Sequence, residues 1–201
     1  MLKSFAAAAA ALALSAGAHA STVVFDASSY HSGDVDTHTY FYTSPFASPA
    51  TGGLLTFTLE GYNTLDGQND YEDDFTLTVN NVAILVGTFD LGGGGNNVVY
   101  SSPTGTTITG LRNDPSSVSN AGGALDFTVP VSLLASGNVI RWNYTALSDS
   151  AHAGFQGIGD EGWGLSDVKV TAVPEPGSLA LMLAGLGIVG GLARRRGARQ
   201  S

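Results

Sequence analysis

Short runs that alternate apolar residues with threonine constrain the fold of this chain more than any other feature. Residues 54–59 read Leu-Leu-Thr-Phe-Thr-Leu, and residues 75–79 read Phe-Thr-Leu-Thr-Val. A period of two places the apolar side chains on one face of a strand, which the helical period of 3.6 does not do. Similar runs lie at 22–25, 39–42, 82–90, 97–100, 106–111, 125–131, 138–146 and 164–171. Their spacing of roughly ten residues predicts an all-β fold, an antiparallel β-sandwich of jelly-roll type.

Two connections between these runs have distinctive compositions. Asn80 and Asn81 separate adjacent runs, and asparagine tolerates positive φ, so residues 75–86 are predicted to form a tight hairpin. Residues 92–95 are all glycine. We predict a flexible connection there, because a phosphate-binding loop would need a lysine and a following helix.

The first twenty residues, 1–20, have the pattern of a secretory signal peptide. Lys3 is their only charge, residues 5–16 are apolar apart from one serine, and Ala18 and Ala20 place small residues where a signal peptidase reads. Cleavage after Ala20 would leave Ser21 as the mature N-terminus. The alternative is an N-terminal membrane anchor, for which the apolar stretch is short.

The last residues, 173–201, have the order of a membrane sorting tail. The uncharged run over 178–193 has sixteen residues. At about 1.5 Å per residue it makes a transmembrane helix of roughly 24 Å, slightly short of the ~30 Å hydrocarbon core. Arginines behind it would stay on the cytoplasmic side and leave everything N-terminal outside. The motif before the run and the charges after it are Val173, Pro174, Glu175 and Pro176, and Arg194, Arg195 and Arg196.

This tail resembles the PEP-CTERM sorting signal of Gram-negative bacteria that make extracellular polysaccharide. The resemblance implies that an exosortase in the inner membrane recognises Pro174-Glu175-Pro176 and cuts the chain nearby. The exported part would then pass from an inner-membrane intermediate to the cell envelope surface or the extracellular matrix. The alternative is an ordinary C-terminal anchor with a proline linker.

The region between the two tails, residues 21–172, is expected to form one exported domain. It contains sixteen Asp and Glu residues against three Arg and Lys residues, a net charge of −13. Such a surface excludes nucleic-acid binding and favours cations or uncharged partners such as neutral glycans. The chain has no cysteine, which excludes disulfides and thiolate metal sites.

An acidic segment just before residue 75 is a candidate calcium site. Calcium takes six to eight oxygen ligands, and such a loop offers both side-chain and backbone oxygens. The spacing does not match an EF-hand. A solvated acidic loop that keeps the domain soluble is the alternative, and catalytic use of paired carboxylates is a third. The candidate residues are Asp66, Asn69, Asp70, Glu72, Asp73 and Asp74.

Aromatic residues at two-residue spacing are candidates for a carbohydrate-binding platform. Trp142 and Tyr144 share one face of a predicted strand, and Tyr40 and Tyr42 share a face of another. Exposed aromatic rings of this kind stack on sugars, and we take Trp142 and Tyr144 as the candidate ligand-binding pair. The same spacing also suits the core of a sandwich, and the pattern leaves both interpretations open.

The final predicted strand resembles the Glu-x-Trp-x-Leu-x-Asp-Val-x-Val ending of exported jelly-roll domains, which include carbohydrate-binding and adhesion modules. Glu161, Trp163, Leu165, Asp167 and the valines that follow carry the resemblance. It implies that Trp163 packs at the end of the sandwich. It also implies that Asp167 fixes a turn or a neighbouring strand.

These observations predict a noncatalytic surface or matrix protein with a structural, adhesive or polysaccharide-associated role. No Gly-x-Ser-x-Gly elbow or His-Glu-x-x-His helix is present, and His31 and His38 are expected to be surface residues. The predicted partners are signal peptidase, an exosortase and extracellular polysaccharide. The alternatives are a secreted glycan-active enzyme, whose two carboxylates only the fold would bring together, and a calcium-stabilised carbohydrate-binding module.

Overall fold

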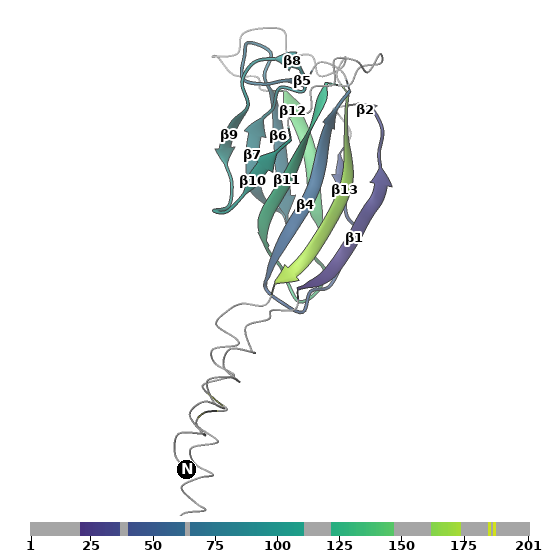
Figure 1. Ribbon diagram of the computed structural model, residues 1–201, viewed down its shortest axis with the longest axis vertical. Helices are drawn as coiled ribbons and strands as arrows, with labels where there is room; N and C mark the ends of the chain where they lie inside the picture. Colours follow the sequence, from purple (N-terminus) through teal and green to yellow (C-terminus); the bar gives the residue numbers. More distant parts are fainter. Residues whose placement is uncertain are drawn as a thin grey trace, which may run out of the picture.

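Two antiparallel sheets face each other in the part of the chain that the structure describes (Figure 1). This computed structural model describes residues 21–36, 40–62, 65–110, 122–146 and 162–173, with residues 185 and 187. The first sheet has the order β1 (Thr22–His31), β13 (Gly162–Val173), β4 (Gly52–Gly61), β11 (Gly123–Ser132) and β10 (Thr107–Thr109), and β2 (Val35–Asp36) pairs with β13. The second has the order β3 (Phe41–Tyr42), β12 (Ile140–Ala146), β6 (Asp73–Val79), β7 (Val82–Thr88) and β9 (Val98–Ser101).

A short parallel pair, β5 (Leu65–Asp66) and β8 (Gly92–Gly94), lies at one end of these two layers. The glycines of β8 were predicted to form a flexible connection, and this prediction is wrong. Gly67 N donates to Gly94 O at 2.7 Å, and a Cβ on Gly95 would lie 2.7 Å from the backbone of Gly67. Gly95 has no room for a side chain because another backbone approaches it closely, and Gly92 and Gly94 have positive φ of 117° and 109°.

The all-β prediction is confirmed, because every predicted run overlaps an observed strand and the two main sheets are antiparallel. The hairpin prediction is also confirmed, since Asn80 and Asn81 have φ of 51° and 66° between β6 and β7. Asn80 also accepts a hydrogen bond from Val139 N at 3.0 Å, which ties the hairpin to the start of β12. The jelly-roll type stays a prediction.

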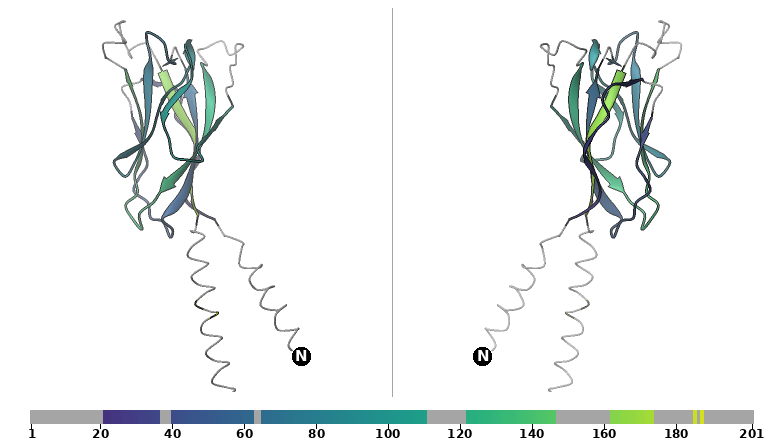
Figure 2. Two further views of the ribbon diagram at one scale, coloured as in Figure 1. Left: turned by 90° about the vertical axis from the view of Figure 1, so that its left-hand side faces the viewer. Right: turned by 90° about the vertical axis from the view of Figure 1, so that its right-hand side faces the viewer.

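The core lies between the inner faces of the two sheets, which Figure 2 shows edge-on as two layers. On β4, Leu55, Phe57 and Leu59 point inward, as period-two alternation requires. Phe57 stacks on Phe127 of β11 with ring centroids 4.6 Å apart, and it meets Trp142 of the opposite sheet edge-on at 5.8 Å. One aromatic cluster therefore joins both layers.

Both ends of the described domain lie at the same end of the sandwich. Thr22, at the start of β1, pairs with Ala172, near the end of β13. The β5–β8 pair lies at the opposite end (Figure 1). In the described residues, no helix is both long and apolar enough to cross a membrane. The predicted signal peptide, the motif residues 174–176 and the arginines 194–196 lie outside the described residues, as does nearly all of the predicted membrane helix.

We expect the aromatic cluster to dominate the stability of the domain. Phe57→Ala should lower the free energy of unfolding by about 3–5 kcal/mol, the usual loss for removing a buried aromatic ring. Leu54→Ala, on the outer face of the same strand, should cost about 1 kcal/mol or less. Urea denaturation followed by tryptophan fluorescence measures both values. Equal losses for the two variants would contradict this description of the core.

Candidate functional site

The acidic segment between β5 and β6 is a hydrogen-bonded turn. Asp66 N donates to Asp73 Oδ2 at 3.0 Å, and Asn69 Nδ2 donates to Asp66 Oδ1 at 2.6 Å. Tyr71 N donates to Asn69 Oδ1 at 2.6 Å. Thr88 of β7 donates its hydroxyl to Asp66 O at 3.0 Å. The side chains of the segment therefore satisfy the backbone of their own turn and join it to the second sheet.

Glu72 is fully buried at this end of the molecule, and Tyr100 of β9 donates its hydroxyl to Glu72 Oε1. Gln68 Nε2 lies 3.5 Å from the same hydroxyl. Burial, followed by the hydrogen bond to Glu72 and the negative charge of Glu72, raises the pKa of Tyr100 to about 12. The contact joins the acidic turn to the far edge strand of the second sheet.

The structure thus separates the six predicted calcium ligands into different environments. Asp66, Glu72, Asp73 and Asp74 are buried, and Asp70 is exposed. The alternative of a solvated acidic loop is therefore wrong for the four buried carboxylates. No group of three or more His, Asp or Glu side chains placed to hold a metal ion occurs within the described residues. Calcium binding stays a prediction.

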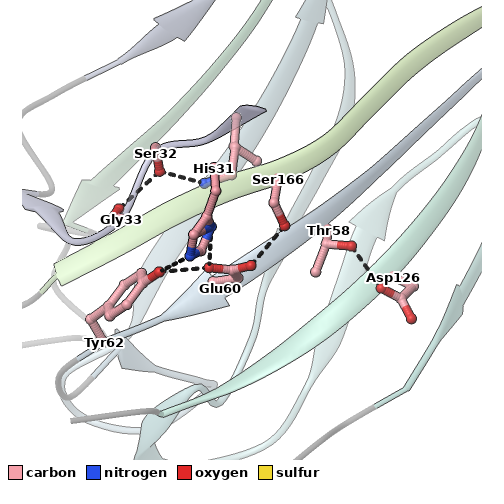
Figure 3. A network of polar contacts seen from close by, with 9 residues as sticks. His31, Ser32, Gly33, Thr58, Glu60, Tyr62, Asp126 and Ser166 are labelled. Carbon is pink, nitrogen blue, oxygen red and sulfur yellow. Dashed lines mark hydrogen bonds and ion pairs between the residues drawn. The ribbon is translucent and has the colours of Figure 1, made fainter. Parts of the chain in front are cut away.

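A second polar network covers the outer face of the first sheet (Figure 3). Glu60 of β4 accepts hydrogen bonds from Tyr62 OH at 2.6 Å and from Ser166 Oγ at 2.7 Å. His31 of β1 places Nδ1 3.2 Å from Glu60 Oε2 and Nε2 3.2 Å from Tyr62 OH. Burial, and then the hydrogen bond and charge of Glu60, raise the pKa of Tyr62. One carboxylate therefore connects β1, β4 and β13.

A close backbone approach shapes the rim of this network. A Cβ on Gly164 would lie 2.6 Å from Gly33 O and 2.7 Å from Ser32 Oγ, so only glycine lets the chain after β1 lie on β13. Ser32 Oγ in turn accepts a hydrogen bond from Leu165 N at 2.9 Å. This network was not predicted from the sequence. Its only local signal is Glu60, which follows the alternating run 54–59 on the polar face.

Another carboxylate on this face is that of Asp126 of β11, which accepts a hydrogen bond from Thr58 Oγ1 at 2.8 Å (Figure 3). Asp126 lies opposite Thr58 in the β11–β4 register, and Ala124 lies opposite Glu60. The two carboxylates are therefore diagonal neighbours on adjacent strands. Each already accepts hydrogen bonds from side chains of the same sheet.

Trp142 and Tyr144 were predicted as a ligand-binding pair, and the structure corrects this assignment. Their side chains are 2% and 4% exposed, because β12 turns them toward the core and turns Arg141 outward. Tyr144 packs against Trp163 with ring centroids 5.2 Å apart. The alternation correctly placed the two aromatic residues on one face, and that face is the buried one.

Trp163 and Asp167 of β13 both serve the fold: one packs in the core and the other shapes the strand. Trp163 is fully buried and meets Phe41 edge-on at 4.8 Å, so the core prediction is confirmed. Asp167 has a φ of 55° where the β13–β4 register shifts between Ser166 and Lys169. Aspartate tolerates this left-handed conformation, which marks a β-bulge.

The exposed counterparts of the buried aromatic pair are Tyr40 and Tyr42. Their side chains are 51% and 66% exposed, and their ring centroids lie 5.9 Å apart. The guanidinium carbon of Arg141 lies 4.5 Å from the centroid of the Tyr40 ring. Tyr40 and Tyr42, the other pair considered as a carbohydrate-binding platform, therefore lie at the surface.

Comparison with known protein families gives one match, the PEP-CTERM protein-sorting motif at residues 172–196. No curated protein and no solved structure matches the chain. The match includes all seven predicted sorting residues and begins at Ala172, within β13. The motif implies exosortase-dependent sorting of an exported protein that is processed at the membrane.

The raised pKa of Tyr100 predicts a loss of stability in alkali. An ordinary tyrosine ionises near pH 10, so the unfolded chain loses this proton before the folded one does. The Tyr100 contact therefore contributes fully to the free energy of unfolding below pH 10, and this contribution is lost as the pH rises toward about 12. Tyr100→Phe should remove this component from the pH dependence of urea unfolding, whereas Tyr71→Phe, at an exposed position, should keep it. An unchanged alkaline profile in Tyr100→Phe would contradict the assignment.

Proposed function

We propose that the protein is a noncatalytic structural or adhesive component of the cell surface or extracellular matrix that associates with polysaccharide. Signal peptidase would cleave after Ala20, and an exosortase would process the tail at Pro174-Glu175-Pro176. One observation carries the proposal: the PEP-CTERM motif begins within the last strand of a β-sandwich. No linker separates the sorting signal from the folded domain.

The positions of the chain ends support this arrangement. The pairing of Thr22 with Ala172 places the segments before and after the domain at one end of the sandwich. With residues 178–193 in the membrane and Arg194 to Arg196 in the cytoplasm, the domain would stand on the outer side of the inner membrane. The acidic turn, at the opposite end, would then face away from the membrane (Figure 1).

A noncatalytic role is supported by what Glu60 and Asp126, on the outer face of the first sheet, already contact. Glu60 is hydrogen-bonded to Tyr62 and Ser166, and Asp126 to Thr58. The contacts of Glu60 with Ser166 and of Asp126 with Thr58 connect neighbouring strands of one sheet, which is a structural task. The jelly-roll-like ending at Trp163 and Asp167 also supports an exported adhesion module of this type.

We expect processing to depend on the tripeptide in the tail. In the native host, replacing Pro174, Glu175 and Pro176 by alanine should leave the full chain in the inner membrane, because the exosortase no longer recognises it. Immunoblots of membrane and matrix fractions measure this. Ser178→Ala, in the same tail but outside the tripeptide, is the matched control and should be processed normally. Normal release of the triple variant would refute exosortase sorting.

Calcium stabilisation of the acidic turn is a second part of the proposal. Its support is the burial of Asp66, Glu72, Asp73 and Asp74, because desolvated carboxylates gain from a nearby cation. Added calcium should raise the melting temperature of the full chain by several degrees relative to a chelator. Asp73→Asn should abolish the rise, and Asp126→Asn, on the outer face of the first sheet, should keep it. Equal melting temperatures in calcium and in chelator would refute calcium stabilisation.

A further inference from the structure

The strand pair β3–β12 at the edge of the second sheet carries an aromatic and cationic surface that the proposed function leaves unused. Phe41 points inward against Trp163, so alternation turns Tyr40 and Tyr42 outward. Arg141 lies opposite Tyr42 in the β12–β3 register. Three large side chains, from β12, from β3 and from the residue just before β3, therefore share one outer face.

The Tyr40 ring holds the guanidinium of Arg141 in place. The guanidinium carbon lies 4.5 Å from the ring centroid, within the range of a cation–π contact. Within the part of the chain that the structure describes, no ion pair involves Arg141. A guanidinium held over an aromatic ring can still bind a carboxylate with two parallel hydrogen bonds from the N–H groups at its edge.

This surface borders two hollows, and Tyr42 belongs to both. The larger hollow has a volume of about 450 Å³ and is lined by Tyr40, Tyr42, Thr78, Asn81, Val139 and Arg141. The smaller one, of about 130 Å³, has Tyr42 and Tyr30 among its lining residues and reaches the apolar side chains of Phe25 and Phe41. An extended ligand that crosses Tyr42 would contact both hollows.

The charge of the larger hollow differs in sign from that of the domain. Its lining holds one cation and no carboxylate, whereas residues 21–172 have a net charge of −13. Repulsion from carboxylates elsewhere on the domain is largely screened beyond the Debye length of about 8 Å at physiological ionic strength. The local charge therefore decides which ligands this surface binds.

We propose that this surface, formed by Tyr40, Tyr42 and Arg141, binds an acidic polysaccharide. Pyranose rings stack on the two tyrosines, and a uronic acid carboxylate pairs with Arg141. Aromatic walls with a few converging polar groups are typical of ligand sites, and Thr78 and Asn81 supply further hydrogen-bonding groups for sugar hydroxyls. The inference rests on the proposed association with polysaccharide and names the site and the charge of the ligand.

Calorimetric titration of the full chain in detergent tests the site. The probes are tetramers of galacturonic, glucuronic and mannuronic acid, each compared with its methyl ester, which keeps the rings and removes the charge. At least one acid should bind more tightly than its ester. Tyr42→Ala should weaken binding by about tenfold or more, as truncation of a tyrosine anchor usually does. Arg141→Gln should remove the preference for the acid over the ester.

Tyr71→Ala, at an exposed tyrosine on the acidic turn, is the matched control and should bind like the natural chain. Melting curves of the variants should coincide, because Tyr42 and Arg141 lie on the outer face. The assignment is overturned if no acid binds, if every acid and its ester bind equally, or if Tyr42→Ala binds normally. Each of these results leaves exosortase processing untouched, so failure of the site and failure of the sorting proposal are distinguishable.

Discussion

The aromatic contact between the two sheets is the interaction on which the rest of the structure depends. Phe57 stacks on Phe127 within its own sheet and meets Phe75 and Trp142 of the facing sheet. With no cysteine in the chain, this domain relies on apolar burial rather than on disulfides. Because strands alternate, fixing these rings inward also fixes which side chains point outward.

The same alternation builds the surface beside the core. Trp142 is inward, so its neighbour Arg141 is outward, and Phe41 is inward between two exposed tyrosines. The register of β3 on β12 then brings Tyr42 opposite Arg141. The outer surface that we assign to an acidic glycan is thus a direct consequence of how the core packs.

The strands could be predicted from the sequence because period-two alternation is a local property. The pattern did not indicate which face is buried, so Trp142 was taken as a ligand-binding residue although its side chain belongs to the core. It also missed β8, because glycines have no side chains that could alternate. The contact of His31 with Glu60 depends on the register of β1, β13 and β4. The two residues are 29 positions apart, and no local pattern in the sequence indicates this register. For the tail, motif order alone was sufficient, and the family comparison confirmed it.

The sorting motif begins within the final strand, which ends at Val173, so the sorting signal follows the folded domain without a linker. The intact mass of the protein recovered from the extracellular matrix tests this account most directly. The account predicts a single chain that begins at Ser21 and ends close to Pro174-Glu175-Pro176. A matrix protein that retains residues 178–201, or that still begins at Met1, would contradict it.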